Sequence, residues 1–91
     1  MLFTPLVAGL AFRERLTQLP AEFRATLRVE PENPYNPSAV AVVGPTGKVG
    51  YVAPELAREL YQKVAGGEVA SCLVRRGNYS PTTGILGILE I

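Results

Sequence analysis

The chain has 91 residues, of which 47% are hydrophobic and 19% charged, and its formal net charge is +1. This length supports one core, so we expect residues 1–91 to form a single domain. The near-neutral charge excludes a broad electrostatic surface for nucleic acid and leaves room for only a few local phosphate contacts.

The residue inventory argues against catalysis. The chain has no histidine, no aspartate and one cysteine, which excludes a Ser-His-Asp triad, a Cys-His pair and a zinc site. A hydrolase would depend on a glutamate such as Glu30 or Glu32, and neither has a visible partner in the sequence. We therefore expect no enzyme activity, no metal and no cofactor.

The start of the chain is apolar but lacks the basic segment of a signal peptide, and no apolar run approaches the length of a membrane span. Cys72 lies in an alternating apolar run, which is typical of a small core residue in a reducing compartment. We expect a cytoplasmic protein that does not enter a membrane.

The first third of the chain predicts two strands. Residues 6–12 (L-V-A-G-L-A-F) form an apolar run, which predicts a strand with Phe12 at its exposed end. Residues 13–19 carry mixed charges and predict one helical turn before a proline. Residues 23–30 alternate apolar with polar, which predicts a strand with one buried face and with Arg28 on the solvent side.

A hairpin follows. Residues 39–43 (A-V-A-V-V) and 48–52 (K-V-G-Y-V) predict two strands, and the glycines and proline of residues 44–47 predict the turn between them. Regular alternation places Val49 and Tyr51 on one face, where the tyrosine ring either packs inward with Val49 or lies at the edge of that face beside the preceding loop.

The remaining third predicts a helix and two strands. Pro54 suits the first turn of a helix over about residues 54–65, which two glycines end. Residues 69–75 predict a fifth strand, residues 78–84 a turn-rich loop and residues 85–91 a sixth strand. Five to six short strands with one inserted helix are best closed as a small barrel, so the fold class is mainly β.

The last predicted strand is apolar on both faces. Two explanations remain open: both faces are covered within the domain, or the strand pairs with another chain at the sheet edge and forms a homo-oligomer.

The most distinctive segment is residues 30–42 (E-P-E-N-P-Y-N-P-S-A-V-A-V). Its prolines fix their own φ angles and restrict the residues before them, so Tyr35 should be held in a stiff loop. A ring held in this way loses little entropy on binding a ligand. As alternatives, the Tyr35 ring plugs an end of the barrel, and Asn33 and Asn36 form turns through their side chains.

Together the segments V-A-G-L-A-F, L-R-V-E-P-E-N-P-Y-N-P-S-A-V-A-V and G-K-V-G-Y-V-A-P-E-L-A-R-E-L resemble the HIRAN domain, a module that occurs alone in bacteria and fused to fork-remodelling DNA translocases in eukaryotes. The resemblance covers nearly the whole chain. It implies an OB-like β-barrel that binds the 3′ end of single-stranded DNA through aromatic stacking and a hydrogen bond from the terminal hydroxyl to a loop carboxylate. Such a module works either alone or with a helicase or nuclease as its partner, and the sequence leaves both alternatives open.

By position, the resemblance implies that Phe12 and Tyr35 are aromatic walls, that Asn36 occupies the carboxylate position, and that Tyr51 follows in the next motif. The chain departs from DNA-binding members in having asparagine in place of aspartate, Ala11 in place of arginine, and alanine and proline in place of lysines before the helix. Weaker phosphate binding with a flatter salt dependence is expected.

Two functions remain open. In the first, the domain binds single-stranded DNA ends weakly, with bases stacked on Phe12, Tyr35 and Tyr51, and with Arg28 either following the DNA backbone or merely solvated. In the second, it is a protein-interaction or self-assembly module without DNA binding, since prolines three residues apart can present a polyproline II ridge.

Overall fold

A computed structural model describes residues 2–7, 10–77 and 85–91 of the chain. The predicted loop at residues 78–84 lies outside these described residues. Along the described residues the elements are β1 (Phe3–Val7), α1 (Leu10–Thr17), β2 (Glu22–Val29), β3 (Val40–Gly44), β4 (Gly47–Val52), α2 (Pro54–Ala65), β5 (Ser71–Arg76) and β6 (Ile85–Glu90).

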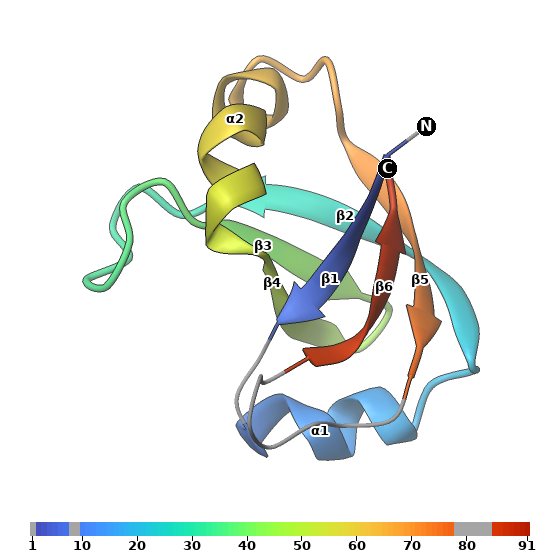
Figure 1. Cartoon of the computed structure of the whole chain (residues 1–91). Helices are drawn as coiled ribbons and strands as arrows, with labels where there is room; N and C mark the ends of the chain where they lie inside the picture. The colour runs from blue at the N-terminus through green and yellow to red at the C-terminus, as the bar shows by residue number, and fades with distance from the viewer. Residues whose placement is uncertain (1, 8–9, 78–84) are drawn as a thin grey trace.

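The strands close into an antiparallel barrel in the order β1-β4-β3-β2-β5-β6, with β6 pairing back to β1. This confirms the predicted fold class, which is mainly β with a small OB-like barrel. The inserted helix predicted over about residues 54–65 is α2, with Pro54 in its first turn and Gly66 as its C-cap. Figure 1 shows α2 and α1 at opposite ends of the barrel.

The predicted first strand, residues 6–12, is wrong in its bounds. The strand is Phe3–Val7, and α1 occupies Leu10–Thr17, where only one helical turn was expected at residues 13–19. A short apolar run fits a strand or a buried helix segment equally well, so its pattern does not decide between them. As a consequence Phe12 lies in a helix and not at the end of a strand.

Strand β2 follows the predicted alternation closely. Phe23, Ala25 and Leu27 are buried, whereas Arg24 and Arg28 are exposed. One face of β2 therefore belongs to the core, and the other is solvated or available to a ligand.

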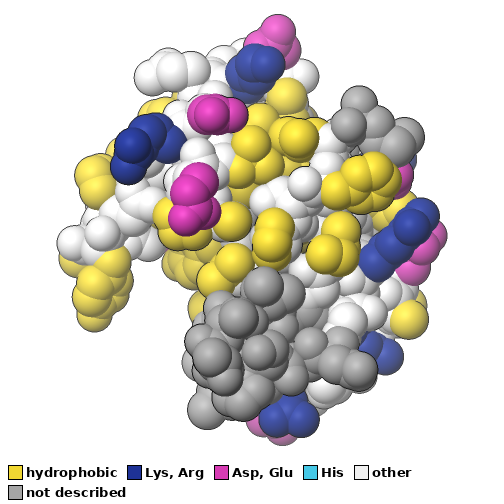
Figure 2. All heavy atoms as spheres, in the orientation of Figure 1, with side chains coloured by type: hydrophobic (Ala, Val, Ile, Leu, Met, Phe, Trp, Pro, Cys, Tyr) yellow, Lys and Arg dark blue, Asp and Glu magenta, His cyan; other side chains and the backbone are white. Residues whose placement is uncertain are grey.

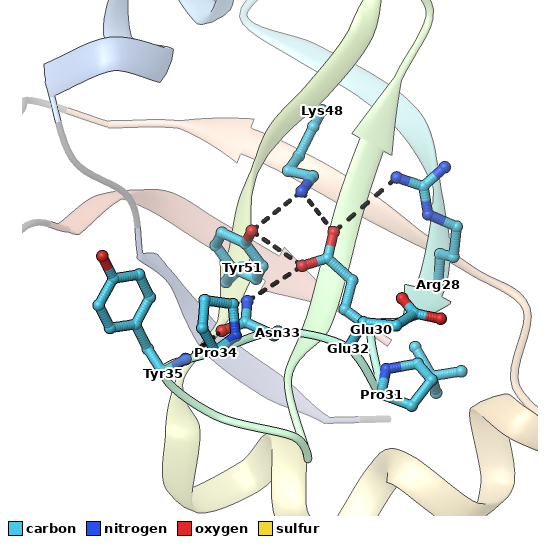
Figure 3. Close-up of a pocket in the computed structure, with 10 residues that line it drawn as sticks. Arg28, Glu30, Pro31, Glu32, Asn33, Pro34, Tyr35, Lys48 and Tyr51 are labelled. Atoms are coloured by element: carbon cyan, nitrogen blue, oxygen red, sulfur yellow. Dashed lines mark hydrogen bonds and ion pairs between the residues drawn. The ribbon is translucent and has the colours of Figure 1, made fainter.

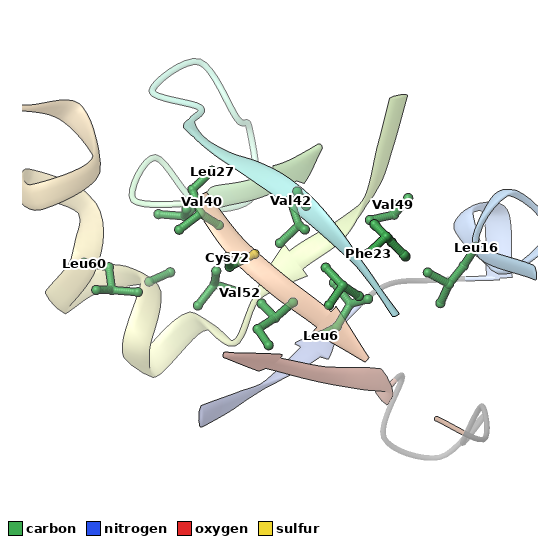
Figure 4. Packing of buried hydrophobic residues seen from close by; sticks show 14 residues of the cluster. Leu6, Leu16, Phe23, Leu27, Val40, Val42, Val49, Val52, Leu60 and Cys72 are labelled. Atoms are coloured by element: carbon green, nitrogen blue, oxygen red, sulfur yellow. The ribbon is translucent and has the colours of Figure 1, made fainter. Parts of the chain in front are cut away.

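The core runs through the barrel from one helix to the other. Leu16 of α1 lies at one end and Leu60 of α2 at the other, with strand side chains between them (Figure 4). Cys72 is fully buried among these side chains, which confirms its prediction as a small core residue. The largest fully buried side chains are Leu6, Leu16, Leu89, Val40, Val42, Val49, Val52, Val74 and Cys72.

Strand β6 has partners along both edges. It pairs with β1 on one side and with β5 on the other, so edge pairing with another chain would require the barrel to open. Leu89 is fully buried on the inner face, whereas Ile88 is 42% exposed on the outer face. The closed barrel does not provide a free edge on β6, and a homo-oligomer through the C-terminal strand stays a prediction.

A β-bulge at the β3–β4 pairing changes which side chains face outward. The register shifts between Val42 and Val43, opposite one extra residue in β4. Val49 is fully buried, while Tyr51 faces outward with Lys48, so the expectation that Val49 and Tyr51 share a face is wrong. The bulge is the reason why two residues three positions apart meet on the outer surface.

Candidate functional site

The loop between β2 and β3 projects from the barrel (Figure 1), and its shape is fixed by hydrogen bonds at its base and in its interior. At the base, the Glu30 amide donates to the Ala39 carbonyl at 3.0 Å. In the interior, Asn33 Oδ1 accepts the amide protons of Tyr35 at 2.9 Å and of Asn36 at 3.0 Å. The turn-forming interpretation of Asn33 is confirmed.

Tyr35 lies at the tip of this loop with 95% of its surface exposed. The alternative in which its ring plugs an end of the barrel is therefore wrong, because the two ends are filled from α1 and α2. A large ring held in water on a well-bonded loop is a feature that a ligand contact would explain.

Asn36 also forms a turn. Its Oδ1 accepts the amide proton of Ser38 at 3.0 Å, and its own carbonyl accepts the amide proton of Ala39 at 3.0 Å. The Asn36 amide oxygen is thus oriented by the backbone, and an amide oxygen has a second lone pair with which to accept another proton.

Behind the loop, four polar side chains meet around the Glu30 carboxylate (Figure 3). The Tyr51 hydroxyl donates to Glu30 Oε1 at 3.0 Å, and Asn33 Nδ2 donates to the same oxygen at 3.1 Å. Lys48 forms an ion pair with Glu30 Oε2, and Arg28 Nη2 lies 3.9 Å from that oxygen. The Glu30 side chain is only 15% exposed, so this carboxylate is paired where it is removed from water.

Lys48 contacts Tyr51 through the hydroxyl and also lies over the ring. Its Nζ lies 2.9 Å from Tyr51 Oη and 5.0 Å from the ring centroid. The Tyr51 hydroxyl accepts from Lys48 and donates to Glu30, so both of its hydrogen-bonding functions are used.

The network shifts the titration of both charged partners. Burial raises the pKa of Glu30, but hydrogen bonds from Lys48, Asn33 and Tyr51 outweigh it, so this pKa lies below its ordinary value. The hydrogen bond to Glu30 raises the pKa of Lys48 above its ordinary value, with a further contribution from Tyr51. Both groups are held in their charged forms at neutral pH.

Two cavities lie side by side at this loop and share Asn33, Tyr35 and Tyr51 in their walls. The first, of about 400 Å³, is mostly apolar, and the rest of its wall comes from Val7, Asn36, Ala39, Val52 and Pro54. The second, of about 630 Å³, includes the charged side chains of Arg28, Glu30, Glu32 and Lys48. An aromatic wall therefore separates an apolar hollow from a hollow whose two positive and two negative charges balance.

The structure brings most of the predicted site residues together. Tyr35, Asn36 and Tyr51 line the apolar cavity, and Arg28 lines the charged one. Phe12 belongs to neither cavity among the described residues, but its ring packs edge-on against Tyr51, with centroids 6.3 Å apart at 76°. Phe12 thus supports an aromatic wall and does not form one.

Sequence reasoning did not find Lys48, and it left Glu30 without a partner. Glu30 and Tyr51 are 21 positions apart, and the pairing of β2 with β3 and of β3 with β4 brings them together. Ala41 lies between Arg28 and Tyr51 in this pairing and is fully buried. The available signal was polar residues at Glu30, just after β2, and at Lys48 and Tyr51 in β4, but without the strand order their meeting could not be predicted.

Within the described ranges, no group of three or more histidine, cysteine or acidic side chains is placed to hold a metal ion. None of the helices in the same part of the chain is long and apolar enough to cross a membrane.

The chain was compared with protein-family models, curated proteins and solved structures, and it matches none of them. Membership of the HIRAN family accordingly stays a prediction that rests on the sequence motifs.

Proposed function

We propose that the chain is a non-catalytic module that binds an end of single-stranded DNA, the 3′ end, by stacking bases on Tyr35 and Tyr51. The observation that carries this proposal is the 95% exposed ring of Tyr35 on a hydrogen-bonded loop, beside an apolar cavity that it shares with Tyr51. A base is flat and apolar on its faces, which suits a hollow with aromatic walls.

The expected affinity is low. Stacking contributes about 1 to 3 kcal/mol per base, and two tyrosines limit the number of stacked bases. Lys48 is already paired with Glu30, and Arg28 lies near the same carboxylate, so the cavity adds little attraction for phosphates. A dissociation constant on the order of micromolar or weaker follows, with a shallow salt dependence.

Recognition of the end is assigned to Asn36. Asn36 lines the apolar cavity, and its amide oxygen, which accepts the Ser38 amide proton, has a second lone pair for a hydrogen bond from a terminal hydroxyl. Because the amide is neutral, it does not repel a terminal phosphate as a carboxylate would. We expect 3′-hydroxyl and 3′-phosphate ends to bind with similar affinity.

Fluorescence anisotropy with labelled oligonucleotides at low salt tests the proposal. Wild-type protein should give saturable binding that depends on a free end, and Tyr35→Ala should abolish it while Tyr35→Phe retains it. Phe3→Ala is the matched control, because Phe3 is an exposed ring outside both cavities. The absence of saturable binding, or equal loss in the Phe3→Ala control, would refute the proposal; strong rejection of the 3′-phosphate would refute the role of Asn36.

A second function is favoured by a different surface. Leu2, Phe3 and Ile88 are 40%, 56% and 42% exposed. Figure 2 shows hydrophobic side chains gathered over the middle of the face that carries β1 and β6. Such a surface suits a protein-interaction or self-assembly module. Analytical ultracentrifugation of wild type and Phe3→Ser tests it, since a concentration-dependent association that the substitution removes is expected only from this function.

A further inference from the structure

The Glu30 carboxylate is the point at which the two aromatic walls of the site are joined. One of its oxygens, Oε1, accepts hydrogen bonds both from the Tyr51 hydroxyl at 3.0 Å and from Asn33 Nδ2 at 3.1 Å. Figure 3 shows the carboxylate beside the Tyr51 ring, joined by dashed lines to both Tyr51 and Asn33. Tyr51 comes from β4 and Asn33 from the β2–β3 loop, and the structure records no hydrogen bond between them among its described residues.

On the loop side, Asn33 transmits this contact to Tyr35. While its Nδ2 donates to Glu30, its Oδ1 accepts the amide protons of Tyr35 and Asn36. The backbone amide of Asn33 also donates to the backbone carbonyl of Glu30 at 3.0 Å. The planar side-chain amide of Asn33 therefore connects the carboxylate to the backbone that carries the exposed ring.

On the barrel side, the same oxygen helps to fix the Tyr51 ring. The hydroxyl is held between Lys48 and Glu30, and the Tyr51 ring forms a T-shaped contact with the Phe12 ring. Lys48 is itself paired with the other carboxylate oxygen, so Glu30 and Lys48 orient each other. A change at Glu30 thus affects both the loop and the ring.

We propose that Glu30 is a positioning residue that fixes the Tyr35 loop relative to Tyr51. It contacts no ligand in this role; it sets the distance between the two walls and reduces the entropy that the loop loses on binding. The consequence for DNA rests on the proposed function, whereas the effect on the loop does not.

Amide hydrogen exchange tests the effect on the loop without any ligand. In Glu30→Ala the amides of Tyr35 and Asn36 should exchange about tenfold faster than in wild type, relative to amides of β5 in the same protein. Glu30→Gln keeps an acceptor oxygen for Tyr51 and Asn33, so it should restore most of the protection. Glu32→Ala is the matched control, because Glu32 is exposed on the same loop and forms no hydrogen bond or ion pair recorded within the described ranges. If the Tyr35 and Asn36 amides of folded Glu30→Ala stay as protected as in wild type, the proposal is overturned.

Two further variants keep the test decisive if Glu30→Ala does not fold. Tyr51→Phe removes only the hydroxyl that reaches Glu30 from the barrel side. Asn33→Ala removes the contact from the loop side together with the acceptor of the Tyr35 and Asn36 amide protons, so it is assessed at Tyr51 and not at the loop. Coupling through the carboxylate predicts that Tyr51→Phe shifts the amide resonances of Tyr35 and Asn36, and that Asn33→Ala shifts the ring resonances of Tyr51. Unchanged resonances in both variants contradict the proposal.

Titration of the same variants with a short oligothymidylate that carries a free 3′-hydroxyl separates the two proposals. At least about tenfold weaker binding by Glu30→Ala, with recovery in Glu30→Gln, supports both of them. If wild type does not bind but exchange rises in Glu30→Ala, DNA binding is refuted and the positioning role is supported. If Glu30→Ala binds as tightly as wild type although its Tyr35 and Asn36 amides exchange faster, positioning of the site is refuted.

Discussion

The guanidinium of Arg76 donates a hydrogen bond of 3.2 Å to the carbonyl oxygen of Leu16, which lies 60 residues earlier in the chain. The same Nη1 also donates to the carbonyls of Thr17 at 3.2 Å and Leu19 at 3.0 Å. One cation thus satisfies carbonyl groups at the C-terminal end of α1 and ties this helix to β5.

Arg76→Ala should therefore lower the free energy of unfolding by about 2 kcal/mol, because half-buried carbonyls lose a charged donor. Arg75→Ala is the matched control. The Arg75 ion pair with Glu22 is more than half exposed at both ends, so its loss should cost about 0 to 1 kcal/mol. Urea denaturation of the two variants measures the difference, and equal losses would contradict the capping role of Arg76.

Gly87→Ala should destabilise the barrel by about 3 kcal/mol or more. A β-carbon at Gly87 would lie 2.3 Å from the carbonyl oxygen of Arg75, which is backbone in the paired strand and cannot yield without breaking the β5–β6 ladder. Gly67→Ala is the comparison. A β-carbon at Gly67 would have no atom within 4 Å, but the φ of +78° is unfavourable for alanine, so this substitution should destabilise the protein by only about 1 kcal/mol. In thermal denaturation, the midpoint temperature of Gly87→Ala should lie well below that of Gly67→Ala.

Stability should depend on the protonation of Glu30. Because its pKa is lower in the folded protein than in the unfolded chain, its contribution is present above the ordinary glutamate pKa of 4.5 and is lost as pH falls through the folded-state pKa. The raised pKa of Lys48 affects stability at alkaline pH. The contribution of Lys48 to stability is present below the ordinary lysine pKa of 10.5 and is lost as pH rises through the folded-state value.

The difference in unfolding free energy between wild type and Glu30→Gln, measured over about pH 3 to pH 7, should shrink as the solution becomes acidic. Glu32→Gln removes an equal charge from the same loop and serves as the control. A difference for Glu30→Gln that does not change with pH would show that the carboxylate charge adds nothing to stability.

If the domain binds single-stranded DNA, Glu30→Gln should bind it more tightly at low salt than wild type does. The substitution releases Lys48 from its ion pair while leaving an acceptor for Tyr51, so one more cation becomes available to phosphates. The slope of log K against log salt should steepen by about 0.7. In the double variant Glu30→Gln with Lys48→Met, the slope should return to the wild-type value; an unchanged slope in Glu30→Gln would contradict a free Lys48.

The elements with a complete local pattern could be predicted from the sequence. Pro54 with apolar residues at helical spacing gave α2 its bounds, and the alternation from Phe23 gave β2 its buried face. The hydrogen-bonded turn before Tyr35 could be predicted from the turn chemistry of Asn33, whereas the stiffness expected from the prolines stays a prediction. In each case the information lies within a few neighbouring residues.

The other features depend on distant parts of the chain. The bulge in β4 is decided by its pairing with β3, so the reversal that turns Tyr51 outward beside Lys48, away from the buried Val49, leaves no mark in the sequence itself. The contact of Glu30 with Tyr51 likewise exists only once three strands are side by side. The predicted roles of Asn36 and Phe12 came from motif position, and the structure adds their orientation and contacts.

The hydrogen bond from the Glu30 amide to the Ala39 carbonyl has a practical consequence. It closes the β2–β3 loop at its base, so the tip can be exchanged without changing the strand pairing beneath it. With Glu30 and Asn33 retained, the barrel is a small, disulfide-free scaffold on which other short loop sequences could be displayed and selected for binding.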